Sequence, residues 1–171
     1  MATTTSEKIY TLGLSEILFG EIAEDGGMGT SLAAIGYTKE DSCTFEQDDP
    51  EDTEFMAEEV EDPVYILSKA GKINFAFELM NPSLDVIKDL FGGDIADGKW
   101  NAPDKLVNCE KSVKLVSDQG YDFEIPRMKL TPKIVGGFSK TGMMTISIKG
   151  VVMQPTKSGV SKLSIGTKAG A

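Results

Sequence analysis

The sequence contains no histidine, and Cys43 and Cys109 are its only cysteines. Histidine is the most common general acid or base and the most common transition-metal ligand, so both kinds of site lose their usual side chain. Two cysteines alone do not form a zinc site. We expect both thiols to be reduced, because the first residues lack the basic and apolar regions of a secretory signal; a disulfide between them is the alternative.

Other motifs of known chemistry are missing as well. The two Gly-Lys pairs are followed by Ile73 and Trp100, whereas a phosphate-binding P-loop needs Ser or Thr there. There is no Gly-x-Ser-x-Gly elbow, and no acidic stretch has the glycine and glutamate spacing of an EF-hand loop. No apolar run approaches the ~20 residues that span a bilayer. The sequence therefore predicts no catalytic residue, no metal site, no cofactor and no membrane partner.

Positive charge is absent from one long segment. Between Glu40 and Asp62 there are twelve Asp and Glu residues and no Lys or Arg. The whole chain has 27 acidic and 17 basic residues, so outside this segment 15 acidic residues stand against 17 basic ones. Such a segment must lie outside any core and repels phosphates or wrongly placed copies of the chain. We expect no sequence-specific binding of nucleic acid.

Alternation of apolar and polar residues predicts two long strands. In Lys72–Met80 every second residue from Ile73 onward is large and apolar, which is the period of a half-buried strand. Met143–Val152 repeats this pattern. Further strands, bounded mostly by Gly, Pro, Asp or Asn, are predicted at Glu16–Ile22, Ser31–Thr38, Asp41–Gln47, Thr53–Val60, Val64–Ser68, Leu106–Cys109, Ser112–Ser117, Tyr121–Ile125 and Met128–Leu130.

Turn residues and one helical segment complete the pattern. Ser117–Gly120 and Ala70-Gly71 separate neighbouring strands and are predicted to turn hairpins. Asn81-Pro82 supplies an N-cap and a first-turn proline, apolar residues then recur at helical spacing, and Gly92-Gly93 ends the pattern. Many short strands with one helix at about residues 82–91 predict a mainly β fold, an antiparallel β-sandwich or barrel.

The acidic segment also contains apolar residues, and Pro50 lies near its centre. We expect two strands joined by a projecting acidic loop at Asp48–Asp52, with Phe55 on one face and Glu54 on the other. A solvated hairpin that protects a sheet edge from aggregation is the alternative. The chain is predicted to form a single domain over residues 1–171, with residues 1–8 and about 155–171 as flexible arms or arms that dock on a neighbour.

Four features follow one another along the chain: an acidic strand pair with a projecting loop, a hairpin at Val64–Leu79, a short capped helix, and a late long strand after Pro132–Gly137. This order resembles the tail tube proteins of long-tailed bacteriophages over roughly residues 10–155. The resemblance implies a virion structural protein that assembles with copies of itself into hexameric rings. The rings stack, together with other tail proteins, into a conduit for DNA. The implied location is the virion tail, made in the cytoplasm of a bacterial host.

The resemblance also implies an acidic lumen that repels DNA and a loop that reaches an adjacent ring. The candidate subunit-interface residues are Phe45, Glu46, Asp48, Asp49, Glu51, Asp52, Glu54, Phe55 and Met56. A ring of head-to-tail contacts needs two complementary patches on each subunit. The candidate basic residues for the second patch are Lys105, Lys111, Lys114, Arg127, Lys129 and Lys133. Assembly is therefore expected to weaken in high salt.

Three other functions remain open. A small β-barrel module that binds an apolar ligand or a peptide would contain a buried apolar cavity. A hydrolase that uses carboxylates would need a carboxyl group whose pKa is shifted by burial or by a close partner. A baseplate or secretion-tube component with the same fold is not distinguished from a tail tube protein by the sequence.

Overall fold

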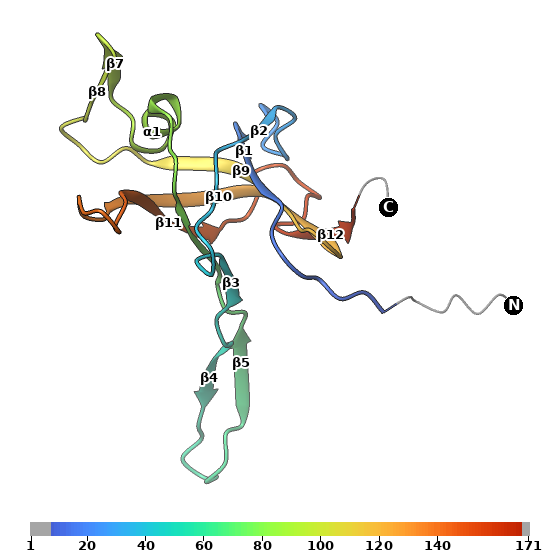
Figure 1. The fold of residues 1–171 in the computed structure, drawn as a ribbon. Helices are drawn as coiled ribbons and strands as arrows, with labels where there is room; N and C mark the ends of the chain where they lie inside the picture. The colour runs from blue at the N-terminus through green and yellow to red at the C-terminus, as the bar shows by residue number, and fades with distance from the viewer. Residues whose placement is uncertain (1–7, 169–171) are drawn as a thin grey trace, which may run out of the picture.

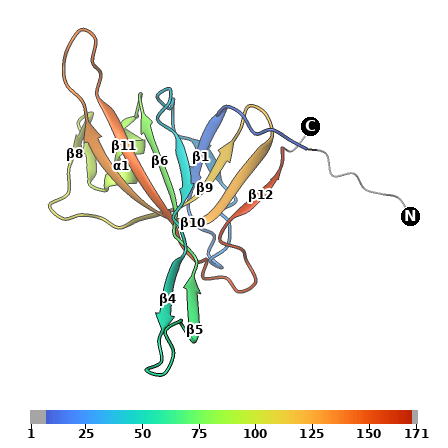
Figure 2. The same cartoon turned by 90° about the horizontal axis from the view of Figure 1, so that it is seen from below.

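The computed structural model describes residues 8–168 and consists almost entirely of antiparallel strands (Figures 1 and 2). Its elements, in chain order, are β1 (Glu16–Gly20), β2 (Leu32–Ala34), β3 (Thr44–Gln47), β4 (Glu51–Phe55), β5 (Tyr65–Lys69), β6 (Ile73–Leu79), α1 (Leu84–Phe91), β7 (Asp94–Ala96), β8 (Lys99–Asn101), β9 (Cys109–Val116), β10 (Tyr121–Val135), β11 (Thr145–Val152) and β12 (Ser164–Thr167). No helix among the described residues is long and apolar enough to cross a bilayer.

Most of the strands belong to one sheet that folds over on itself. Its order is β2-β1-β9-β10-β11-β6-β3, and β12 pairs with the first part of β10. The pairing of β10 with β9 shifts between Ile125 and Met128, and such a bulge bends a strand. The two ends of the sheet, β2 and β3, do not pair with each other, so the barrel is not closed. The predicted mainly β fold is confirmed, in the form of a β-sandwich.

One hydrophobic core fills the sandwich. Strand β6 buries Ile73, Phe75, Phe77 and Leu79 and leaves the residues between them half-buried, which confirms the predicted alternation. The Phe77 ring lies edge-on to that of Phe19 on β1, with 6.0 Å between centroids. Helix α1 covers one side of the core with Ile87 and Leu90. The other fully buried apolar residues are Ile17, Val113, Ile125, Met128, Ile146 and Ile148.

Helix α1 is present, but its predicted N-terminal cap is wrong. The N-cap is Ser83, whose hydroxyl oxygen accepts a hydrogen bond from the backbone N–H of Val86 at 3.2 Å. The Asn81 side chain instead accepts a hydrogen bond from the backbone N–H of Tyr37. Asparagine and serine are both good N-caps. The spacing of apolar residues in the helix is compatible with either one, so the sequence did not distinguish Asn81 from Ser83. Gly92, with φ at 76°, ends the helix as predicted.

A two-stranded arm projects from the sandwich (Figures 1 and 2). Strands β4 and β5 pair only with each other, from Glu51 opposite Lys69 to Phe55 opposite Tyr65. They continue the pair β3 and β6 beyond the edge of the sheet. The chain therefore runs outward along β3 and β4, turns at residues 56–64, and returns along β5 and β6. We call residues 51–69 the arm.

The projecting segment is confirmed, but two details of its prediction are wrong. The chain does not turn at Asp48–Asp52. Asp48 lies at the base of the arm, where its backbone N–H donates to the Lys72 carbonyl at 2.8 Å and its carboxylate accepts from Asn74. Ala70-Gly71 does not turn a hairpin either, because β5 and β6 run in one direction along the same side of the arm. The turn-forming residues here interrupt the strand pairing without reversing the chain.

Other boundaries also differ from the prediction. Tyr121–Ile125 and Met128–Leu130 are parts of the single strand β10, and residues 106–108 lie outside any strand. The turn at Ser117–Gly120 connects β9 with β10, as predicted. In the predicted terminal arms, residues 1–7 and 169–171 lie outside the described residues, whereas Ser164–Thr167 form β12 on the edge of β10.

Candidate functional site

The arm is a single layer of two strands, and it exposes large apolar side chains. Residues opposite each other on paired strands share a face, so Phe55, Tyr65 and Leu67 lie together on one face of the arm. The Phe55 and Tyr65 rings are 5.8 Å apart, yet these residues are 48% and 59% exposed. A lone hairpin has no second layer that covers such a face. No part of residues 8–168 therefore buries the apolar face of the arm.

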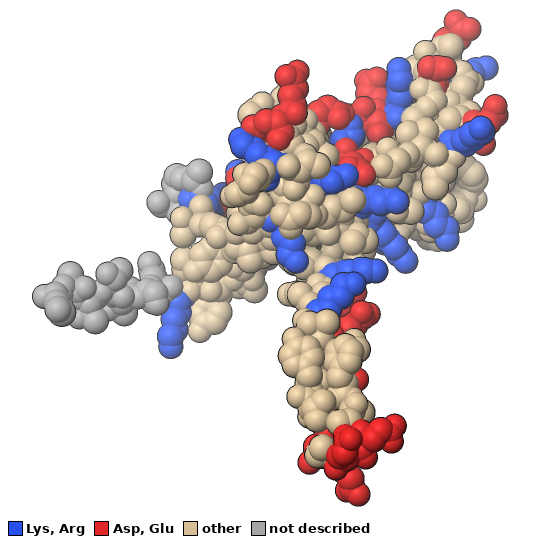
Figure 3. Space-filling view, turned by 180° about the vertical axis from the view of Figure 1, so that it is seen from behind, with Lys and Arg blue, Asp and Glu red and all other residues tan. Residues whose placement is uncertain are grey.

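Acidic side chains surround the end of the arm, where Figure 3 shows a dense cluster of Asp and Glu. Glu58, Glu59, Glu61 and Asp62 are all exposed, and none of them forms an ion pair with the described residues. The same turn also exposes Val60, which lies between the two acidic pairs, and Met56 and Val64 at its ends. The arm thus combines an apolar face with a strongly negative tip.

The predicted interface residues fall in three places. Glu51, Asp52, Glu54 and Phe55 belong to β4, and Met56 begins the turn; Asp48 and Asp49 lie at the base of the arm; Phe45 and Glu46 belong to β3. Phe45 packs against Phe123 with 5.2 Å between ring centroids, so part of its surface is already covered within the chain. The structure therefore separates one sequence segment into a base and a free outer part.

Half of the predicted basic residues already have acidic partners in the same chain. These pairs are Lys111–Glu21, Lys114–Glu124 at 3.2 Å and Arg127–Glu110 at 2.8 Å. Lys105, Lys129 and Lys133 are exposed and form no ion pair with the described residues. Only these three are free to meet an acidic partner from outside.

Sequence reasoning missed the extent of the basic region. Residues 125–171 contain eight Lys and Arg residues and no Asp or Glu, a signal that a count of acidic residues along the chain shows directly. The basic hairpin, as we call residues 129–149 of β10, β11 and their connecting loop, lies within it. Lys129, Lys133 and Lys149 share its outer face, and the loop at 136–144 adds Lys140 and Phe138, which is 99% exposed.

Glu110 is held by two donors at the start of β9. Arg127 Nε lies 2.8 Å from one carboxylate oxygen, and Asn108 Nδ2 lies 2.9 Å from the other. The hydrogen bond from Arg127, followed by that from Asn108, lowers the pKa of Glu110 below its usual value. The negative form of this carboxylate is therefore more favourable in the folded chain than in the unfolded chain.

Glu110→Gln is expected to reduce the loss of stability in acid. Because the folded pKa is lowered, the stabilisation by ionised Glu110 is present above its unfolded pKa of about 4.3 and is lost as the pH falls through the folded value. The free energy of unfolding of the wild type should decrease between about pH 5 and pH 3 by about 0.5–1 kcal/mol more than that of the variant, since the ion pair is partly exposed. Urea denaturation across this range measures the difference. Glu61→Gln, which removes an exposed carboxylate without a partner, is the control, and parallel pH profiles of wild type and Glu110→Gln would contradict the expectation.

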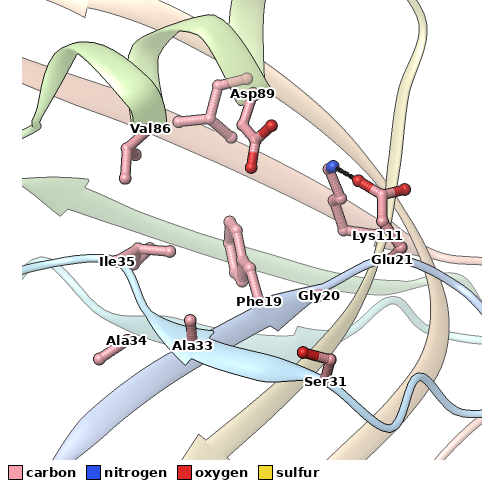
Figure 4. Close-up of a pocket in the computed structure, with 11 residues that line it drawn as sticks. Phe19, Gly20, Glu21, Ser31, Ala33, Ala34, Ile35, Val86, Asp89 and Lys111 are labelled. Atoms are coloured by element: carbon pink, nitrogen blue, oxygen red, sulfur yellow. Dashed lines mark hydrogen bonds and ion pairs between the residues drawn. The ribbon is translucent and has the colours of Figure 1, made fainter.

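A cleft of about 240 Å³ lies between α1 and strands β1 and β2 (Figure 4). Its wall is mostly apolar, and Lys111 lies at one end, paired with Glu21 and near Asp89. Burial alone would lower the pKa of Lys111. The hydrogen bond to Glu21 and the negative charge of Asp89 together raise the pKa by more than burial lowers it, so the net shift is upward. A lysine held in its charged form is poorly suited to act as a nucleophile or a base.

A second cleft, of about 350 Å³, lies beside Phe45 and Phe123 and is open to solvent. Ligand pockets usually enclose roughly 300–1,000 Å³ and bury most of the ligand. Neither cleft is the enclosed apolar cavity that a small-molecule binding module was expected to contain. Within residues 8–168, no group of three His, Cys, Asp or Glu side chains is placed to hold a metal ion.

Cys43 and Cys109 form no disulfide in the structure, so the alternative of a bond between them is not observed. Burial raises the pKa of the Cys43 thiol, and burial is also the largest cause of the raised pKa of Cys109. Thiols of this kind stay protonated near neutral pH and react slowly.

Two features thus distinguish this chain. One is the exposed arm, and the other is the basic hairpin, whose lysines form no ion pair with the described residues. Neither a protein-family model nor a curated protein sequence matches it.

Proposed function

We propose that this protein is a structural subunit that assembles with copies of itself. The observation that carries the proposal is the apolar face of the arm, which nothing in the described chain covers. Exposed apolar surface of this kind, bordered by charged residues, marks sites of protein association. The described clefts, by contrast, offer only open surfaces for a small ligand.

The form of assembly that we propose is a stack of hexameric rings, the tail tube of a long-tailed phage, located in the virion tail beside other tail proteins. An open β-sandwich with one short helix and a long projecting hairpin agrees with the architecture that the resemblance implies. Two different surfaces of opposite charge on one chain favour head-to-tail contacts, which close into rings when the rotation permits. Seven of the 27 acidic residues lie on the arm, so the arms would carry a concentrated part of the negative charge of such a tube.

A peptide-binding module is the second candidate. The outer edge of β3 has no strand partner among the described residues, and the cleft beside Phe45 adjoins it. Extended peptides bind such edges by adding a strand. A module of this kind would remain monomeric while it binds the peptide.

Electron microscopy of negatively stained protein, together with light scattering over a wide concentration range, tests the proposal. We expect rings or tubes of sixfold symmetry and a mass that rises with concentration. The assembly should weaken at high salt, because the charges on the arm and the basic hairpin are exposed to screening. A mass of one chain at every concentration and salt would overturn the proposal and favour the peptide-binding module.

A further inference from the structure

We propose that the basic hairpin is the surface on which the arm of a second copy docks. This inference rests on the proposed self-assembly and specifies its contact. It joins two surfaces that are far apart in the sequence. Each exposes apolar side chains together with charges that have no partner among the described residues, and these charges are all of one sign except for Lys69 at the base of the arm.

The apolar parts of the two surfaces match in character. On the arm, Phe55, Tyr65 and Leu67 form an exposed apolar face. On the basic hairpin, Phe138 stands almost fully exposed in the connecting loop, and Met143 and Met144 follow it with 54% and 37% of their surface exposed. Methionine side chains adapt to irregular partners and contact aromatic rings favourably. Docking would remove both sets from water at once.

The charges of the two surfaces are opposite. The tip of the arm carries only acidic charge between residues 51 and 62, and the basic hairpin carries Lys129, Lys133, Lys140 and Lys149 without any Asp or Glu. None of these lysines forms an ion pair with residues 8–168. Contact between two arms would bury apolar surface too, but their acidic tips repel each other. Charge therefore selects the contact of arm with basic hairpin over that of arm with arm.

The arm of the same chain is not placed to fill this role. It is held by the continuous strand pairs β3–β6 and β4–β5 and leads away from the body in both views, whereas the loop between β10 and β11 leaves the body elsewhere (Figures 1 and 2). The basic hairpin is therefore open to the arm of another copy. Because the two surfaces differ, a docked pair still has one free arm and one free basic hairpin, and further copies can be added in the same way.

Charge reversal tests the contact. Glu58→Lys with Glu59→Lys on the arm, or Lys133→Glu with Lys140→Glu on the basic hairpin, is expected to raise the concentration needed for assembly at least tenfold. The four substitutions in one chain should restore assembly to near the wild-type concentration. Lys88→Glu with Lys99→Glu changes the net charge by as much as the pair of substitutions on the basic hairpin, at exposed positions that are not candidate interface residues, and should leave assembly nearly unchanged. Circular dichroism of each variant shows whether it is folded.

Cross-linking tests the same contact directly. Chains with Tyr65→Cys are mixed with chains with Phe138→Cys under mild oxidation and analysed on a non-reducing gel. A linked dimer is expected in the mixture and not in either variant alone. Wild-type assembly without rescue by the fourfold variant and without the linked dimer would overturn this contact and leave the proposed function standing. Wild-type protein that never assembles would overturn both.

Discussion

Replacing Phe55, Tyr65 and Leu67 together by threonine is expected to raise the concentration required for assembly by roughly 100-fold. Each side chain is about half exposed, so full burial in an interface adds about 1 kcal/mol per residue. Three such losses amount to about 3 kcal/mol, or roughly two powers of ten in an association constant. Threonine retains a high β propensity and should keep the strands paired. Light scattering at increasing concentration measures the shift.

The body of the protein should not respond to these three substitutions. The arm makes no contribution to the sandwich core, so the free energy of unfolding of the body is expected to change by less than about 0.5 kcal/mol. Tyr37→Thr is a suitable control, because Tyr37 is also exposed but lies between β2 and β3, outside the arm. If the triple variant assembled at the wild-type concentration, the apolar face of the arm would not be an interface.

The second large effect is expected in the core, where Phe77→Ala should lower the free energy of unfolding by about 3–5 kcal/mol. Phe77 is 1% exposed and contacts the rings of Phe19 and Phe75. Its removal leaves a cavity that the backbone cannot close, because β6 is held between β11 and β3. Single domains are stable by only about 5–15 kcal/mol, so this loss is a large part of the total. Urea denaturation should show a lower midpoint with an unchanged slope.

Phe138→Ala provides the matched comparison, because it makes the same chemical change at a fully exposed site. Its effect on the free energy of unfolding should be below about 0.5 kcal/mol. Its effect on assembly should be large, since Phe138 is proposed to be covered by the arm of another copy. A loss of less than 1 kcal/mol for Phe77→Ala would contradict the assignment of the core, and unaltered assembly of Phe138→Ala would count against the contact.

The fold was predictable where a single physical cause determines the local structure. In β6, burial of one face dictates the alternation from Ile73 to Leu79, and the sequence displays it without competition. Gly92 ends α1 because a left-handed conformation is needed there. The N-cap was not predictable, because Asn81 and Ser83 satisfy the same local requirement and a tertiary contact, the hydrogen bond from Tyr37 to Asn81, decides between them.

The candidate site was harder to predict, because it depends on which strands pair. Pro50 and Gly71 are typical of turns, yet in the structure they lie where two successive strand pairs meet. The conformational preferences of proline and glycine predict that a strand is interrupted at these positions. They do not predict whether the chain then reverses or continues outward, because that depends on the pairing of β3 with β6 and of β4 with β5. The basic hairpin was missed for a different reason. Its lysines are widely spaced and form no motif, and the informative property is the absence of acidic residues around them.

The close packing at the base of the arm bears on the entropy of association. A side chain at Gly71 would lie within 1.8 Å of the Asp48 carbonyl oxygen, so the two strands approach as closely there as a glycine allows. The hydrogen bond from the Asp48 N–H to the Lys72 carbonyl joins them across the same point. An arm fastened in this way has few orientations before it meets a partner. It therefore loses less conformational freedom on docking than a flexible loop of the same length, and more of the burial energy remains as affinity.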